Sequence, residues 1–181
     1  MRTHIWLACA VGLAGAALAA FVLVYFAPQD LFIDTSISDP VPTATAAPSI
    51  RPTSSPLTNA PPATSAAPIV LAHGAFRSGE HRTTGTALLL KLADGRTFVR
   101  LQDLDTSNGP DVRIWLSAAD AQASDGIVHS SEYVDLGGLK ANHGNQNYLV
   151  PAGTDLASFR SVVVWCRRFE VVFGAAPLGA R

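Results

Sequence analysis

Residues 86–101, TALLLKLADGRTFVRL, decide the fold class of this chain. A mostly apolar run ends at Leu92, the pair Asp94-Gly95 follows, and a second run of strand-forming residues begins at Thr97. An Asp-Gly pair between two such runs is typical of a β-hairpin, because a type I′ turn needs a positive φ at both central positions. The sequence therefore predicts two antiparallel strands joined by a tight turn at Asp94 and Gly95.

Three further segments have the composition of short strands. They are rich in β-branched and aromatic residues, and they cover residues 112–116 (VRIWL), 162–166 (VVVWC) and 171–173 (VVF). Clusters of turn-forming residues lie at 106–110 and 142–145, and after residue 68 a helical period is never kept beyond a turn or two. We therefore expect an all-β domain over residues 69–181, an antiparallel β-sandwich or a barrel-like fold.

The N-terminal region predicts a membrane anchor over residues 1–27. Residues 5–26 carry no charge, and at about 1.5 Å per residue they span roughly 33 Å, enough to cross a hydrocarbon core. The apolar run continues past the small residues Ala17 and Ala19, which favours an uncleaved anchor over a cleaved signal peptide. Arg2 precedes the run and Asp30 follows it. We expect a single-pass protein of the cell membrane with a cytoplasmic N-terminus and an extracytoplasmic C-terminal domain.

Residues 28–68 are expected to form a disordered linker. The stretch is rich in Pro, Thr, Ser and Ala and holds few large apolar residues. Such a segment cannot bury enough surface to offset its conformational entropy, and its prolines favour extended states in which residues 35–68 have an upper reach of roughly 100 Å. The sequence thus predicts a stalk that holds the domain clear of the membrane.

The charge balance and the absence of familiar motifs exclude several function classes. Charged residues make up only 15% of the chain, whose formal net charge is −1, so we expect no nucleic-acid partner. The sequence contains no G-x-S-x-G motif and no glycine-rich phosphate loop. Hydrolase and transferase chemistry therefore has no support, and whether the protein is an enzyme stays open.

Cys166 is the residue that most invites a chemical interpretation. The other cysteine, Cys9, lies in the apolar N-terminal run, so Cys166 is the single cysteine of the expected domain. In an oxidising compartment it could be a buried inert thiol, an intermolecular disulfide, or a reactive or ligating thiol. If the strand continues regularly, Arg168 shares its face, where a guanidinium would stabilise the thiolate.

No metal site is predicted from the polar residues. The four histidines of the domain lack the spacing of a zinc site and are interpreted as isolated surface residues, although a His/Cys pair from separate strands, such as haem axial ligands, stays an alternative. The loop from Asp103 to Asp111 is rich in carboxylates, but Asn108 stands where an EF-hand requires glycine.

Several segments of the domain, taken in order, resemble one family. They are His73-Gly74-Ala75-Phe76; Ser78-Gly79-Glu80-His81; Thr106-Ser107-Asn108-Gly109-Pro110-Asp111; Asp135-Leu136-Gly137; Gly144-Asn145-Gln146-Asn147-Tyr148; and Val162-Val163-Val164-Trp165-Cys166 with Phe173-Gly174. This ordered set resembles the DM-thirteen domain, also called the electron-transfer DM domain, over nearly all of the chain after residue 68.

The resemblance implies a β-rich extracytoplasmic module with a role in redox or electron transfer. It implies that Cys166 acts as a bare thiol or holds a prosthetic group such as haem, and the family motif offers His81 as a second ligand. In animals and plants the resemblance includes cytochrome-like partner domains, whereas this sequence shows only an anchor and a stalk beside the domain, so we expect the electron donor or acceptor to come from another protein.

Two functions follow as hypotheses. In the first, the protein is a membrane-tethered redox module in which Cys166 is the working thiol or ligand and Arg168 stabilises the thiolate. In the second, it is a non-catalytic surface module for binding or adhesion to an envelope ligand. Polar residues 140–148 would then form the contact face, and Cys166 would be packed in the core.

Overall fold

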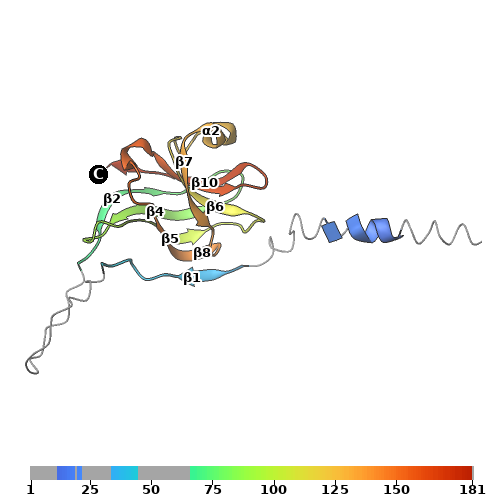
Figure 1. Ribbon diagram of the computed structural model, residues 1–181, viewed down its shortest axis with the longest axis horizontal. Helices are drawn as coiled ribbons and strands as arrows, with labels where there is room; N and C mark the ends of the chain where they lie inside the picture. Colours follow the sequence, from blue (N-terminus) through green and yellow to red (C-terminus); the bar gives the residue numbers. More distant parts are fainter. Residues whose placement is uncertain (1–11, 19, 22–33, 45–65, 181) are drawn as a thin grey trace, which may run out of the picture.

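The computed structural model describes residues 12–18, 20–21, 34–44 and 66–180, and it places two β-sheets face to face (Figure 1). The first sheet has six strands in the order β1-β8-β5-β4-β2-β11, and the second has five in the order β3-β10-β9-β6-β7. All strand pairs are antiparallel except the parallel pair β1–β8. The elements are β1 (Ser36–Ser38), β2 (Ile69–Ala75), β3 (Arg77–Ser78), β4 (Thr84–Lys91), β5 (Thr97–Asp105), β6 (Val112–Ser117), α2 (Asp125–Ser130), β7 (Tyr133–Gly138), β8 (His143–Leu149), η2 (Leu156–Ser158), β9 (Ser161–Cys166), β10 (Val171–Pro177) and β11 (Gly179–Ala180). The expected antiparallel β-sandwich is confirmed.

The hairpin predicted at Asp94 and Gly95 is confirmed, but its turn is of another type. Strands β4 and β5 pair along their length, from Lys91 opposite Thr97 onward. The N–H of Gly95 donates to the carbonyl oxygen of Leu92 (3.0 Å), and only Gly95, not Asp94, has a positive φ (+87°). A three-residue loop with one glycine in the left-handed region replaces the expected two-residue type I′ turn.

The other predicted strands are confirmed as β6, β9 and β10, whereas the turn predicted at residues 142–145 is wrong. Residues 142–145 were expected to form a turn, yet β8 begins at His143. The physical reason lies in its neighbours: β8 pairs with β5 on one side and with β1 on the other. Main-chain pairing on both sides outweighs the local preference of Asn and Gly for turns.

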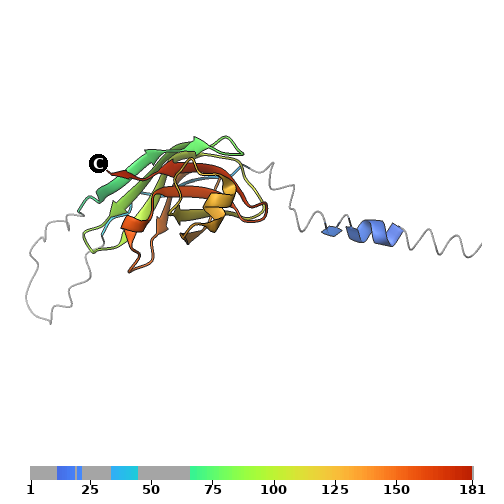
Figure 2. The ribbon, with the colours of Figure 1, turned by 90° about the horizontal axis from the view of Figure 1, so that it is seen from above.

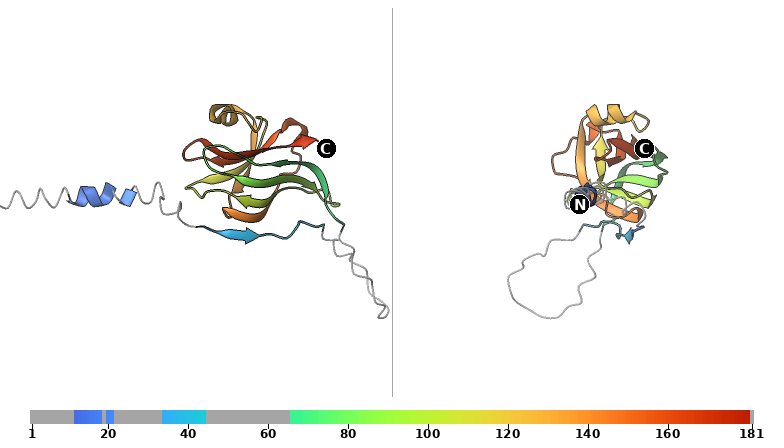
Figure 3. Two further views of the ribbon diagram at one scale, coloured as in Figure 1. Left: turned by 180° about the vertical axis from the view of Figure 1, so that it is seen from behind. Right: turned by 90° about the vertical axis from the view of Figure 1, so that its right-hand side faces the viewer.

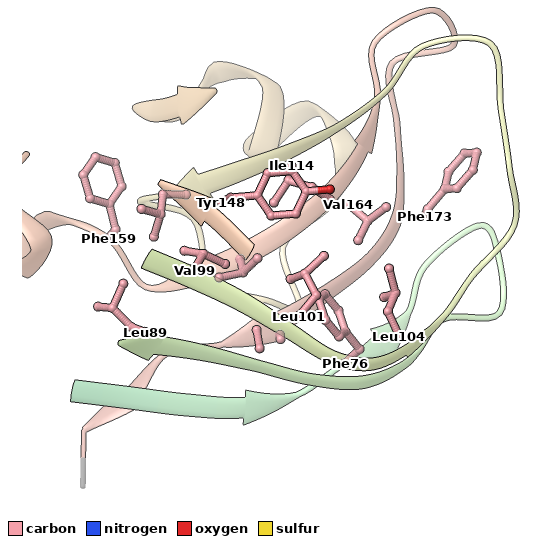
Figure 4. Close-up of a cluster of buried hydrophobic side chains, with 14 of the residues drawn as sticks. Phe76, Leu89, Val99, Leu101, Leu104, Ile114, Tyr148, Phe159, Val164 and Phe173 are labelled. Atoms are coloured by element: carbon pink, nitrogen blue, oxygen red, sulfur yellow. The ribbon is translucent and has the colours of Figure 1, made fainter. Parts of the chain in front are cut away.

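The main core fills the space between the two sheets (Figure 4). It is built from apolar side chains of both layers, including Leu89, Val99, Leu101, Ile114 and Phe173, all of them buried. Alternate residues of each strand point into this space, as the period of two requires.

A second, smaller cluster covers the outer face of the five-stranded sheet. It contains Trp115, Val163 and Trp165 from the sheet and Val128 from the short helix α2. Figure 3 shows α2 and β1 on opposite sides of the sandwich. In Figure 2 the C-terminal end of the chain lies alongside β2, with which β11 pairs. The main core covers one face of the five-stranded sheet, and this second cluster covers the other.

The N-terminal expectations meet the structure only in part. The predicted anchor over residues 1–27 lies largely outside the described residues, and among those that are described no helix is long and apolar enough to cross a membrane. Most of the linker, residues 45–65, is likewise outside them. Residues 34–44 differ from the expected free stalk, because β1 pairs with β8 at the edge of the sheet. Composition alone could not indicate this pairing, since its partners lie about a hundred residues later.

Candidate functional site

Cys166 is the last residue of β9, and its side chain is fully buried, with 0% of its surface exposed. Its backbone lies between Val171 of β10 and Val112 of β6. The predicted alternation is confirmed: Val164 and Cys166 belong to the core between the sheets, whereas Trp165 belongs to the outer cluster. The thiol is therefore sealed inside the sandwich, away from solvent.

Aromatic packing closes the core near the start of β10. Phe173 sits where the pairing of β10 with β9 shifts register, and its side chain is buried in the same cluster as Cys166. The His81 ring lies against the Phe173 ring, with 3.8 Å between their centroids. A Cβ on Gly109 would lie 2.9 Å from Cγ2 of Val112 and 3.1 Å from the Phe173 ring, so the backbone of Gly109 approaches the ring closely. His81 and Gly109 thus cover Phe173 from the loops.

These residues do not fit a haem held between Cys166 and His81. The sulfur lies in a closed apolar cluster, and the His81 ring packs at a tilt against the Phe173 ring. Neither the groove of about 550 Å³ beside Lys91 and Leu149 nor the smaller one beside Arg77 is lined by Cys166. Axial ligation would require core side chains to separate, so no step is assigned to haem.

Arg168 was expected on the same strand face as Cys166, but the structure does not continue the strand that far. The expectation rested on a strand that continues past Cys166, whereas β9 ends there and residues 167–170 form the turn to β10. The neighbouring Arg167 points to another partner, since its Nε donates to Oδ2 of Asp111 at 2.8 Å. The alternation that would have set a guanidinium beside the thiol thus stops two residues before Arg168.

Three aromatic rings form a continuous stack on the outer face of the same sheet. The Tyr133 ring lies 3.9 Å from the Trp115 ring, centroid to centroid, and the Trp115 ring lies 4.9 Å from the Trp165 ring, both in stacked geometry. Tyr133 is 43% exposed, whereas both tryptophans are buried. Trp165 precedes Cys166 directly in the chain. The stack therefore leads from the surface to the residue next to the buried thiol.

Trp115 has an unusual feature within this stack. Its indole nitrogen Nε1 is buried and has no hydrogen-bond partner among the described residues. A buried donor without an acceptor costs about 1–3 kcal/mol, and buried tryptophans usually find one. The unpaired group therefore calls for an explanation other than stability.

The remaining polar candidates are separate from Cys166. The described residues hold no group of three or more His, Cys, Asp or Glu side chains that could bind a metal ion. His143 lies between two carboxylates, with Nδ1 3.3 Å from Asp105 and Nε2 3.4 Å from Asp34. His129 lies beside the Trp165 ring, at 5.8 Å between centroids.

The aromatic stack is the part of the site that sequence reasoning missed. The period of two correctly placed Trp165 on the face opposite Cys166. The strand pairing was needed to bring Trp115 beside it, because β6 and β9 are neighbours in the sheet but lie about fifty residues apart in the chain. A tryptophan in each of two strands was the available signal.

The comparisons with known proteins address the family. No curated protein and no solved structure matches the chain. The family model described as electron transfer DM13 matches residues 75–178, which span β3 to β10 and include Cys166 and the three stacked rings. The match covers more than half of the chain and agrees with the resemblance read from the sequence motifs. This chain therefore belongs to the electron transfer DM13 family.

Proposed function

We propose that the protein is a membrane-tethered, extracytoplasmic electron-transfer module in which Cys166 exchanges single electrons with the surface through Trp165, Trp115 and Tyr133. The observation that carries the proposal is the unbroken stack, with 3.9 Å and 4.9 Å between successive ring centroids. Membership of an electron-transfer family supports a redox role. The tether is supported by the uncharged residues 5–26 and the preceding Arg2.

Burial of the thiol favours single-electron transfer over thiol–disulfide exchange. Exchange requires a thiolate to attack a disulfide sulfur directly, so the two sulfur atoms must touch. Cys166 is fully buried, and such a contact would require the sandwich to open. An electron can pass along stacked rings without that opening, which makes the closed core compatible with this chemistry.

The proposed step balances with a one-electron acceptor supplied by a partner protein. The acceptor takes one electron at Tyr133, and the stack passes the deficit inward to Trp165, from which it crosses the main chain of β9 to the sulfur. The Cys166 thiol gives up one electron and its proton, which leaves a neutral sulfur radical. The proton reaches solvent by a local fluctuation of the exposed turn at residues 167–170, a far smaller opening than the entry of a second sulfur atom would need. A one-electron donor of the partner later restores the electron while the thiol regains a proton. Neither His81 nor Arg168 is required by this proposal.

The unpaired indole nitrogen of Trp115 is consistent with this role. Retaining a buried N–H without an acceptor among the described residues lowers stability. A ring chosen for its ability to lose an electron explains why tryptophan occupies the position.

The test is photo-oxidation of the full chain in detergent micelles, in a Trp6→Phe background that leaves only the two tryptophans of the domain. A photogenerated one-electron oxidant in solution is applied, the protein is then unfolded, and remaining thiols are counted by alkylation and assigned by peptide mass. We expect loss of the Cys166 thiol, slowed several-fold by Trp115→Phe. Tyr148→Phe, a buried tyrosine outside the stack, is the matched control and should leave the rate unchanged.

Two results would overturn the proposal. An intact Cys166 thiol after oxidation of the starting chain would favour the binding module, with Cys166 as a core residue. Equal rates in Trp115→Phe and Tyr148→Phe would remove the stack from the route.

A further inference from the structure

The edge of β8 carries an extended segment from the N-terminal region (Figures 1 and 3). Ser36, Ile37 and Ser38 pair in parallel with β8, with Ile37 opposite Gly144. The pairing is extended at its start, where the N–H of His143 donates to the Thr35 carbonyl at 3.1 Å. An uncovered sheet edge is a template for an added strand, and such addition is a common mode of peptide recognition.

Charged side chains of the domain hold the second half of this segment. Oδ2 of Asp39 accepts from Nζ of Lys140 (2.8 Å) and from the N–H of Asn147 (3.0 Å). The Lys140 contact holds the pKa of Asp39 below its ordinary value. Arg100, itself buried, donates to the carbonyl oxygens of Asp39 at 3.1 Å and Pro40 at 3.3 Å. These contacts favour a peptide that has a carboxylate at the position of Asp39 and, at the next position, a main-chain carbonyl directed toward Arg100.

A buried asparagine holds the first half. Oδ1 of Asn142 accepts from the N–H of Thr35 (2.7 Å), and its Nδ2 donates to Oδ1 of Asp34 (2.8 Å). The same amide also donates to the Thr106 carbonyl, which fixes its orientation from within the domain. The site therefore has an amide at one end and two cations at the other, matched to carboxylates five residues apart.

The shape of the edge is adapted to the segment at Gly144. Its φ is +100°, and a Cβ there would lie 2.0 Å from the carbonyl oxygen of Ile37. The nearest atoms to that Cβ all belong to Ile37. A side chain at this position would block the segment without entering the core.

We propose that the edge of β8 is a peptide-binding site whose ligand is this chain's own segment 34–40, an extended peptide with the pattern Asp-x-x-x-x-Asp-Pro. The contacts are almost all polar, and within the segment only Ile37 and Asp39 are even half-buried. Such a ligand can detach without exposing a core. Because residues 140–148 supply most of the contacts, the contact face expected for a binding module is used here within the chain.

Docking would shorten the tether, a consequence that rests on the membrane anchor of the proposed function. With residues 34–40 held, only the residues before Asp34 separate the domain from the apolar N-terminal run. Release adds residues 34–68 to the connection, which at about 3.1 Å per residue lengthens its reach by roughly 110 Å. The site would thereby set the distance between the domain and the membrane.

The experiment uses the full chain in micelles, with a protease recognition sequence placed within residues 50–60 and an affinity tag at the N-terminus. After cleavage on the resin, we expect the domain to remain bound to the N-terminal fragment. A synthetic peptide of residues 33–44 should elute it, and the same peptide with Asp34→Asn and Asp39→Asn should not.

Matched variants test the site itself. Gly144→Ala should release the domain on cleavage, whereas Gly137→Ala should not, since Gly137 also has a positive φ (+121°) but nothing within 4 Å of its added Cβ. Lys140→Ala should weaken retention several-fold relative to Lys91→Ala, which provides a second comparison if Gly144→Ala fails to fold. Release of the unsubstituted domain on cleavage, or elution by the carboxylate-free peptide, would overturn the proposal. Neither outcome depends on electron transfer, so the two proposals fail separately.

Discussion

Replacing Cys166 by serine should destabilise the domain more than replacing it by alanine. The side chain is 0% exposed and lies in an apolar cluster with Phe173 and Val164. Removing the sulfur deletes one heavy atom, which for a buried group costs about 1 kcal/mol of unfolding free energy. A serine hydroxyl removes the same sulfur and adds a polar group, and burying that group without a partner costs about 1–3 kcal/mol.

The backbone around Cys166 gives the hydroxyl little to bond. Strands β6 and β10 pair with β9 on either side, so their carbonyl groups are engaged in the sheet. We therefore expect the serine variant to be less stable than the alanine variant by about 1–2 kcal/mol. For a domain of about a hundred residues that difference lowers Tm by roughly 4–8 °C.

Urea unfolding of the full chain in micelles, followed by tryptophan fluorescence, gives the two free energies. The chain without a substitution and Cys9→Ser, which changes the cysteine outside the domain, are the controls. A serine variant as stable as the alanine variant, or more stable, would show that the sulfur lies in polar surroundings and would refute the packing described here.

Three further predictions concern other parts of the domain. Burial raises the pKa of Tyr148 to about 12, so a spectrophotometric titration should show one tyrosine that ionises well above the ordinary value, and Tyr148→Phe should remove it; its persistence in that variant would contradict the assignment. The hydrogen bond from Lys140 lowers the pKa of Asp39. The ionised carboxylate therefore stabilises docking of β1 at pH values above the ordinary pKa of 3.8, and this contribution is lost as the pH falls through the lowered pKa. Hydrogen-exchange protection of the Asp39 amide, which donates to the Asn145 carbonyl, should drop in acid, and unchanged protection would contradict this prediction. Gly95→Ala should cost about 1–2 kcal/mol through its positive φ alone, because open space surrounds the added Cβ, and urea unfolding would contradict this by showing no loss.

Local patterns predicted much of the sandwich. The strands around Asp94-Gly95 and the run from Val162 to Cys166 were identified because period two, β-branched composition and turn residues all agree there. Strand β8 was missed because it begins at His143, and the next two residues, Gly144 and Asn145, are of types that favour turns. Its stability depends on partners from β5 and β1, which no local window contains.

The site was predictable to a smaller extent. Cysteine counting singled out Cys166, and strand alternation placed its side chain opposite Trp165, as the structure has it. The same alternation failed for Arg168, since the turn that begins at Arg167 ends the strand. The contact of Trp115 with Trp165 depends on the register of β6 against β9, which is a property of the whole sheet.

The segment 34–40 shows why composition misjudged the linker. Its surroundings are rich in Pro, Thr, Ser and Ala, and such stretches rarely fold by themselves. Here the segment gains its order from Asn142, Lys140 and Arg100, which belong to the domain. Disorder estimated from a segment alone omits this contribution of a preformed edge.

The most direct test of the electron route is electron paramagnetic resonance of the full chain, frozen shortly after one-electron photo-oxidation in the Trp6→Phe background. The account predicts a sulfur-centred radical in the chain that retains Cys166. In Cys166→Ala the deficit should instead be trapped on the stack, as a tyrosyl or tryptophanyl radical that Tyr133→Phe alters and Tyr148→Phe does not. Identical spectra with and without Cys166 would contradict the account, because the thiol would then take no part in the transfer.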